Sequence, residues 1–208
     1  MYQDKDRKYA IIAIGYYIVL FSGYFLMGIM YKKGFGHYSL IQWLLGGVVI
    51  LITLLKDKSI NNLGFSKERI KPNLVIASII VIIAVCFALV YSDIPALRIF
   101  RGAAYYLIYI SLLEEMIFRG IIQNYLFGMH VNRKITYAIG ALFFSLMHLP
   151  FQMYVNDMVS VSYVIVAAPQ LVFTFLFHLL MCFITYKTKD ILIPTAVHFA
   201  IDFVQAVV

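Results

Sequence analysis

The chain has 208 residues, of which 63% are hydrophobic and only 13% are charged, and its net charge is +7. Soluble globular domains carry about 25% charged residues, so this composition excludes a water-soluble fold and predicts an all-α bundle of transmembrane helices. A spanning helix takes roughly 20 apolar residues, which leaves no room for a soluble domain. Residues 1–208 are therefore expected to form a single membrane-embedded domain.

Seven apolar runs are predicted to cross the bilayer. The first is too long for a signal-peptide core and lacks a small-residue cleavage site, so it is expected to be retained as a span. In chain order the runs cover residues 9–31, 40–55, 74–91, 102–127, 134–149, 161–186 and 191–208.

The basic residues lie mainly in the short loops between these runs, so their charge is interpreted as a topology signal and nucleic acid is excluded as a partner. The amino terminus and the second, fourth and sixth loops contain twelve Lys and Arg residues, and the opposite set contains four. The positive-inside rule then predicts a multi-pass protein of the cell membrane, with a cytoplasmic amino terminus and an extracytoplasmic carboxyl terminus.

The fourth run contains three ionisable residues, Glu114, Glu115 and Arg119. A charge at the bilayer centre costs roughly 2.5 to 3.5 kcal/mol, so these residues need partners or a function. Glu115 and Arg119 are four residues apart on one helix face and are expected to pair. Glu114 points about 100° away and needs a partner on another helix. Such a carboxylate is a candidate general acid or base.

Two further runs contain histidines at informative places. His148 ends the fifth run, and His198 precedes Asp202 by four residues in the last one, a spacing that lets a carboxylate orient an imidazole. If Glu114, His148 and His198 converge, with Asp202 behind them, they can hold and activate a water. His178 has no acidic residue nearby in the sequence and is expected to make an interhelical hydrogen bond.

Three strings in the second half of the chain match the motifs of a known family. EEMIFR matches EExxxR, FSLMH matches FxxxH, and HFAID matches Hxxx(D/N), in the same order and on separate hydrophobic helices. The chain is thereby similar to the CPBP family of intramembrane proteases, which includes the type II CAAX prenyl endopeptidases and the bacteriocin-processing or self-immunity (Abi-like) proteins. Members of this family commonly have eight spans, so an eighth span is an alternative to the seven counted here.

The resemblance implies hydrolysis of a peptide bond in a membrane-associated protein or peptide, such as a CAAX-like, bacteriocin or signalling-peptide precursor. It places the catalytic motifs in residues 103–208. The site residues it implies are Glu114, Glu115, Arg119, His148, His198 and Asp202. No oligomeric state is assigned.

Two mechanisms stay open at this point. In the zinc mechanism, Glu114, His148 and His198 are metal ligands and a water takes the fourth position. In the metal-free mechanism, Glu114 and His148 act directly as bases and His198 donates a hydrogen bond to the oxyanion. Two histidines and a glutamate are side chains that bind zinc in catalytic sites, so the sequence favours a site that can work with zinc.

Two non-enzymatic readings compete with a protease. The first is a catalytically inactive family member that acts as a membrane binding or regulatory (immunity) protein, which missing motif residues would favour, and none is missing. The second is a transporter, which usually shows internal repeats and broken helices in both halves. Here the ionisable residues inside spans all lie in the second half.

Overall fold

The computed structural model describes residues 5–208, and this range is helical without a strand. The α-helices are α1 (Arg7–Lys32), α2 (Leu40–Asp57), α3 (Ile70–Tyr91), α4 (Ala96–Ala104), α5 (Leu113–Glu115), α6 (Gln123–Leu126), α7 (Arg133–Leu146), α8 (Leu149–Val155), α9 (Ser162–Val166), α10 (Ala168–Thr188) and α11 (Leu192–Val207). Two 3₁₀ turns, η1 (Ile60–Leu63) and η4 (Phe127–Met129), and two π-helical segments, η2 (Tyr105–Leu112) and η3 (Met116–Ile122), lie between them.

Within the described range, six helical stretches are long and apolar enough to cross a membrane. They are Arg7–Lys32, Leu40–Asp57, Ile70–Tyr91, Ala96–Met129, Arg133–Val155 and Ala168–Thr188. The predicted all-α, polytopic fold is therefore confirmed. The seventh run forms α11, whose 16 residues rise about 24 Å, less than a hydrocarbon core of about 30 Å.

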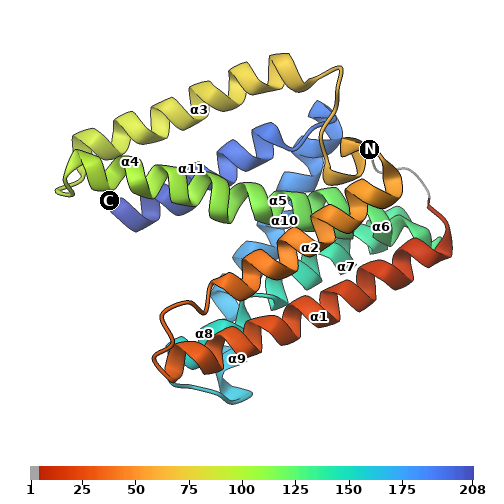
Figure 1. Ribbon diagram of the computed structural model, residues 1–208, viewed down its shortest axis with the longest axis horizontal. Helices are drawn as coiled ribbons and strands as arrows, with labels where there is room; N and C mark the ends of the chain where they lie inside the picture. The colour runs from red at the N-terminus through yellow and green to blue at the C-terminus, as the bar shows by residue number, and fades with distance from the viewer. Residues whose placement is uncertain (1–4) are drawn as a thin grey trace.

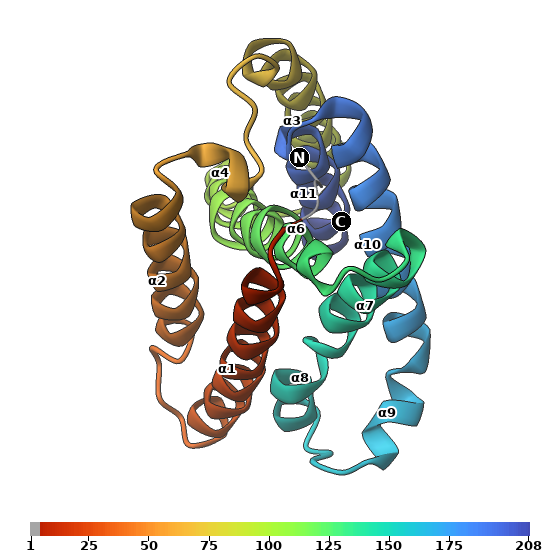
Figure 2. The same cartoon turned by 90° about the vertical axis from the view of Figure 1, so that its right-hand side faces the viewer.

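The elements from α4 to η4 form one continuous helical stretch, the central helix, around which the others are arranged (Figures 1 and 2). In Figure 2 the helices α1 and α2 lie on one side of it, α7 and α10 on another, and α3 and α11 towards a third. Within this arrangement α11 packs on α3 and η2, α10 packs on α7, and α1 packs on α8. The side chains of the central helix therefore meet several neighbours, and its ionisable residues can find partners there.

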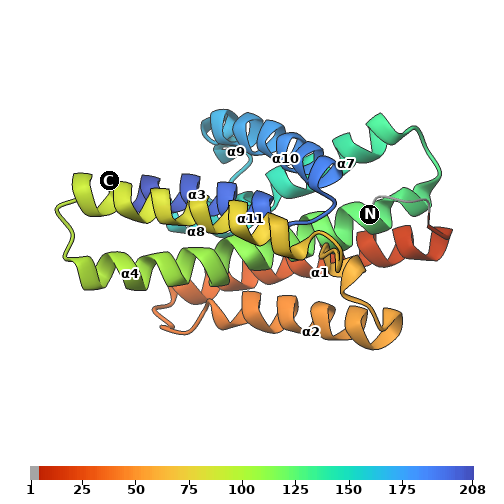
Figure 3. The same ribbon diagram turned by 90° about the horizontal axis from the view of Figure 1, so that it is seen from above.

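Helix α1 begins at one end of the long axis and α11 finishes near the other end, as Figures 1 and 3 show. This separation agrees with an odd number of crossings. Which end faces the cytoplasm stays a prediction from the charge count.

Close backbone contacts anchor the central helix. A Cβ atom on Gly120 would lie 2.2 Å from the carbonyl oxygen of Leu63, so η1 can approach the central helix only at a residue without a side chain. On the same side of the molecule, the amide groups of Ser66 and Leu192 each donate to the carboxylate of Asp190 at 2.8 Å. Burial raises the pKa of Asp190, and the amide donors oppose that shift. These contacts join the start of α11 to the connection between α2 and α3.

The helix is interrupted near the end of the fifth predicted run and again inside the sixth. Helix α7 ends at Leu146, and His148 lies at the junction with α8. Helices α9 and α10 meet at Ala167, directly before the first turn of α10, which contains Pro169. The first of these interruptions places His148 at the turn between α7 and α8.

Candidate active site

Glu114 and Glu115 lie in the short segment α5, between the two π-helical segments of the central helix. In a π-helix the hydrogen bonds run from i to i+5, so the side chains leave the regular 3.6-residue register. Such segments occur frequently at functional sites. The two glutamates are thus presented from a helix whose register changes on both sides of them.

The ion pair predicted between Glu115 and Arg119 is present. An Nη atom of Arg119 lies 3.0 Å from Oε1 of Glu115, and neither side chain is exposed. Among the described residues, the guanidinium nitrogens have no hydrogen-bond partner with good geometry. The guanidinium instead lies over the ring of Phe144 at 4.1 Å and near that of Phe177 at 5.7 Å. The buried cation is stabilised by one carboxylate and by aromatic faces.

His198 lies between three carboxylates. Its Nδ1 atom is 2.9 Å from Oε1 of Glu115, and its Nε2 atom is 3.2 Å from Oδ2 of Asp202 and 3.8 Å from Oε2 of Glu114. Glu114 therefore finds its partner on another helix, as expected. The contact from His198 to Glu115 joins this cluster to Arg119, and the spacing of residues along either helix gave no sign of it.

This arrangement does not fit the predicted zinc site. Each ring nitrogen of His198 faces a carboxylate oxygen, and a ring that donates to both carboxylates has no lone pair left for a metal ion. Among residues 5–208, no group of three or more His, Cys, Asp or Glu side chains is placed to hold a metal. Glu114, His148 and His198 are therefore not assembled as a ligand set.

His148 reaches the site from the junction of α7 and α8. Its Nδ1 atom lies 2.9 Å from the carbonyl oxygen of Phe144, so Nδ1 donates and Nε2 is left as an acceptor in the neutral ring. The Phe144 ring contacts it edge to face, with 5.1 Å between the ring centroids. Phe144 thus packs beside the site.

His148 shares a small cavity with Glu114. The cavity has a volume of about 30 Å³. This is enough for a single water molecule, which needs roughly 10 to 15 Å³ of such space. Its lining residues are Tyr24, Glu114, Phe118, Phe144, Met147 and His148. Glu114 keeps 16% of its side chain exposed, whereas Glu115 has none. Glu114 is therefore the glutamate that a water can reach.

The six predicted site residues fall into two groups. Glu114, Glu115, Arg119, His198 and Asp202 are joined by close charge contacts. His148 joins them through the cavity it shares with Glu114. Tyr24, which lines the cavity from α1, was not predicted from the sequence. As one of 16 tyrosines in an apolar chain, it carries no signal of its own.

A comparison with protein families agrees with the motifs. The family model described as type II CAAX prenyl endopeptidase Rce1-like matches residues 96–204. The match begins at the first residue of α4, ends within α11, and contains all three motifs. No curated protein and no solved structure matches the chain at a significant level.

Proposed function

Because the chain belongs to the Rce1-like type II CAAX prenyl endopeptidase family of intramembrane proteases, we propose that it hydrolyses a peptide bond of a membrane-associated protein or peptide. The observation that carries the proposal is the water-sized cavity that Glu114 and His148 share inside a helical membrane protein. A carboxylate and an imidazole acceptor beside one water are the groups that general-base hydrolysis needs.

In the proposed reaction the water in this cavity attacks the carbonyl carbon of the scissile bond. Glu114 accepts one proton from the water, with His148 as the second acceptor that orients it. When the tetrahedral intermediate collapses, the C–N bond breaks and the proton passes from Glu114 to the leaving amine. General acid and base catalysis of this kind contributes about 10² to 10⁴-fold.

His198 has two parts in the proposal. Its Nε2 atom, 3.8 Å from Glu114, keeps that carboxylate in place before substrate binds. The same N–H is the nearest charged donor for the oxyanion that forms after attack. Glu115 and Asp202 hold the ring at its two nitrogens, and Arg119 is a positioning residue that acts through Glu115.

We propose the metal-free mechanism over the zinc mechanism. The support comes from His198, whose ring nitrogens both face carboxylates. A zinc ligand would need one of these nitrogens as a free acceptor.

The substrate we propose first is a CAAX-like carboxyl-terminal peptide on a lipid-anchored protein, because the matching family is described by that activity. A bacteriocin precursor and a signalling-peptide precursor share its chemistry, a peptide bond presented at the membrane. A catalytically inactive, regulatory membrane protein is the second candidate.

One experiment separates the protease from the regulatory protein. Membranes from cells that produce the wild type, Glu114→Gln or Glu68→Gln are compared by mass spectrometry of new peptide termini. Glu68, in the loop before α3, is the one glutamate outside the central helix, so its replacement is the matched control. We expect the same cleavage products with the wild type and Glu68→Gln, and none with Glu114→Gln at equal abundance. Identical termini in all three samples would overturn the protease and support the regulatory protein.

A further inference from the structure

One side chain of the water cavity comes from outside the part of the chain that the family model matches. The match covers residues 96–204, whereas Tyr24 lies on α1 and lines the cavity beside Glu114 and His148. Of the described side chains that line the cavity, Tyr24 alone carries a hydroxyl group. The reaction proposed above gives this hydroxyl no part.

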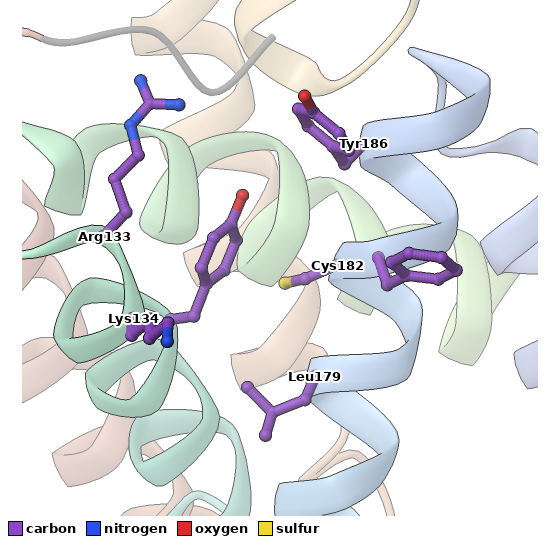
Figure 4. A pocket seen from close by; sticks show the side chains of 7 residues that line it. Arg133, Lys134, Leu179, Cys182 and Tyr186 are labelled. Carbon is purple, nitrogen blue, oxygen red and sulfur yellow. The ribbon is translucent and has the colours of Figure 1, made fainter.

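A tyrosine at a cavity is not by itself a sign of function. A larger cavity, of about 530 Å³, lies between the start of α7 and the second half of α10, where Tyr186 lies across from Arg133 (Figure 4). None of the described side chains that line this larger cavity is a glutamate or a histidine. Tyr24 differs because it shares its cavity with Glu114 and His148 and interacts electrostatically with Glu114.

The packing of α1 on α8 holds Tyr24 at the cavity. Helix α8 begins directly after His148. One turn beyond Tyr24, a Cβ atom on Gly28 would overlap the ring of Tyr154 and lie 3.0 Å from the Cβ atom of that residue. The ring of Phe25 also meets that of Tyr154 edge to face, with 6.4 Å between the centroids. Close contacts between the two helices therefore keep Tyr24 beside the turn that carries His148.

The three polar side chains of the cavity can bind a water in one orientation. The Glu114 carboxylate accepts one hydrogen of the water, and Nε2 of His148 accepts the other, because Nδ1 of that ring lies 2.9 Å from the carbonyl oxygen of Phe144 and donates to it. The Tyr24 hydroxyl is the group that can donate to the water oxygen. One lone pair of the water is then bound, and the other is free to attack a carbonyl carbon.

We propose that Tyr24 is a further catalytic residue, whose hydroxyl donates a hydrogen bond to the attacking water. The hydroxyl keeps its proton, since Glu114 accepts the proton that the water loses. As the water oxygen forms its bond to the carbonyl carbon, the hydrogen bond from Tyr24 stays on that oxygen in the tetrahedral intermediate. This inference rests on the hydrolysis proposed above, and it adds α1 to the elements that the active site needs.

The kinetics of Tyr24→Phe test the proposal, because this substitution removes the hydroxyl and keeps the ring. Cleavage of a prenylated CAAX peptide is measured over a range of concentrations on protein reconstituted in vesicles. Loss of the water's orientation should lower kcat by about 10- to 10²-fold. KM should stay within about twofold of the wild-type value, because the hydroxyl contacts the water and not the peptide.

Tyr17→Phe is the matched control on the same helix. Tyr17 precedes Tyr24 by seven residues, about two turns, and so lies on the same face of α1. Its ring stacks on that of Phe143 with 3.9 Å between the centroids, and its hydroxyl has no partner among the described residues. We expect kcat and KM of this variant to match the wild type. Equal values of kcat in Tyr24→Phe and Tyr17→Phe would overturn the assignment.

A structure that resolves water molecules tests the contact without reference to cleavage. In the wild type, one ordered water should lie within about 3.2 Å of the Tyr24 hydroxyl, of Glu114 and of His148, and it should lose its order in Tyr24→Phe. This water in place without cleavage by the wild type would support the contact and refute the proposed hydrolysis. Cleavage that depends on Glu114, with no water beside Tyr24, would refute the role of Tyr24 alone.

Discussion

Two buried histidines lie close to Phe144 and have very different surroundings. His178 on α10 and His198 on α11 have ring centroids 5.5 Å and 6.2 Å from that of Phe144. His198 faces carboxylates at both ring nitrogens. His178 contacts the amide oxygen of Gln123 through Nε2 at 3.1 Å, and its Nδ1 atom has no partner among the described residues.

The region around His178 is closely packed. The side-chain amide of Gln123 also donates to the carbonyl oxygen of Thr136 at 3.3 Å. A Cβ atom on Gly140 would lie 1.9 Å from Oε1 of Gln123, so a side chain at this position would displace the Gln123 amide from its contact with His178. The side chain that His178 contacts here is a neutral amide. The predicted interhelical hydrogen bond of His178 is therefore confirmed.

The region around His198 contains charged side chains and has room for water. Glu114 and Asp202 are partly exposed, and Glu114 borders a cavity that has room for water. Both histidines are buried, so burial alone does not distinguish the two regions. The distinguishing features are carboxylates at the nitrogens of His198 and a nearby water-sized space.

The largest effect should come from the two residues that share this cavity. Glu114→Gln and His148→Gln should each lower the cleavage rate by about 10² to 10⁴-fold, because each removes an acceptor for the protons of the water. Rates are measured on protein reconstituted in vesicles. Because groups that act as a unit are not additive, the double variant should lose little more than the more damaging single variant. A double loss equal to the product of the single losses would show that the two residues act independently.

Replacing Arg119 tests whether its ion pair with Glu115 stabilises the fold. Arg119→Ala should destabilise the protein by about 3 to 5 kcal/mol, because it leaves the buried Glu115 carboxylate without its cation. The measurement is the amount of folded protein in the membrane and its thermal midpoint. Arg119→Met combined with Glu115→Gln removes both charges and should restore much of the folded protein. Normal abundance with lost activity in Arg119→Ala would instead show that Arg119 takes part in the chemistry.

The two histidines can be compared directly by the same substitution. His198→Gln should reduce activity by about 10²-fold, because the charged donor beside Glu114 is lost. His178→Gln should leave the cleavage rate near that of the wild type and cost about 0.5 to 1.5 kcal/mol of stability, the net value of a typical hydrogen bond. Cleavage rate and thermal midpoint are measured on both variants. Equal loss of activity in the two would refute the distinction between the two regions.

Hydropathy predicted where the chain is helical because an apolar run of sufficient length has few alternatives in a bilayer. It missed the first part of the fourth stretch, which begins at Ala96 rather than at residue 102, because Arg98 and Arg101 interrupt the apolar run. It also missed the π-helical segments, since a change from i+4 to i+5 hydrogen bonds leaves no clear period in the sequence.

The contacts of the site that lie within one helix could be predicted from the sequence, whereas those between helices could not. Residue spacing predicted the contacts of Glu115 with Arg119 and of His198 with Asp202, and both are present. The contact between Glu115 and His198 depends on how α11 packs against the central helix. Spacing along one helix carries no information about that distance, so the contacts of His198 with the two glutamates could be found only in the packed bundle.

The smallest expected effect is that of removing metal. If both nitrogens of His198 donate to carboxylates, exhaustive treatment with a membrane-permeant chelator should leave the cleavage rate unchanged, and elemental analysis of the active protein should find less than one zinc per chain. Asp202→Ala sharpens the test, because in the metal-free mechanism it lowers activity by loosening the His198 ring without changing the metal content. In a zinc enzyme the same variant would weaken metal retention by about 10 to 100-fold, as loss of a partner of a ligating histidine does. A rate that falls on chelation and returns only with zinc would mean that His198 turns one nitrogen away from its carboxylate in the working enzyme.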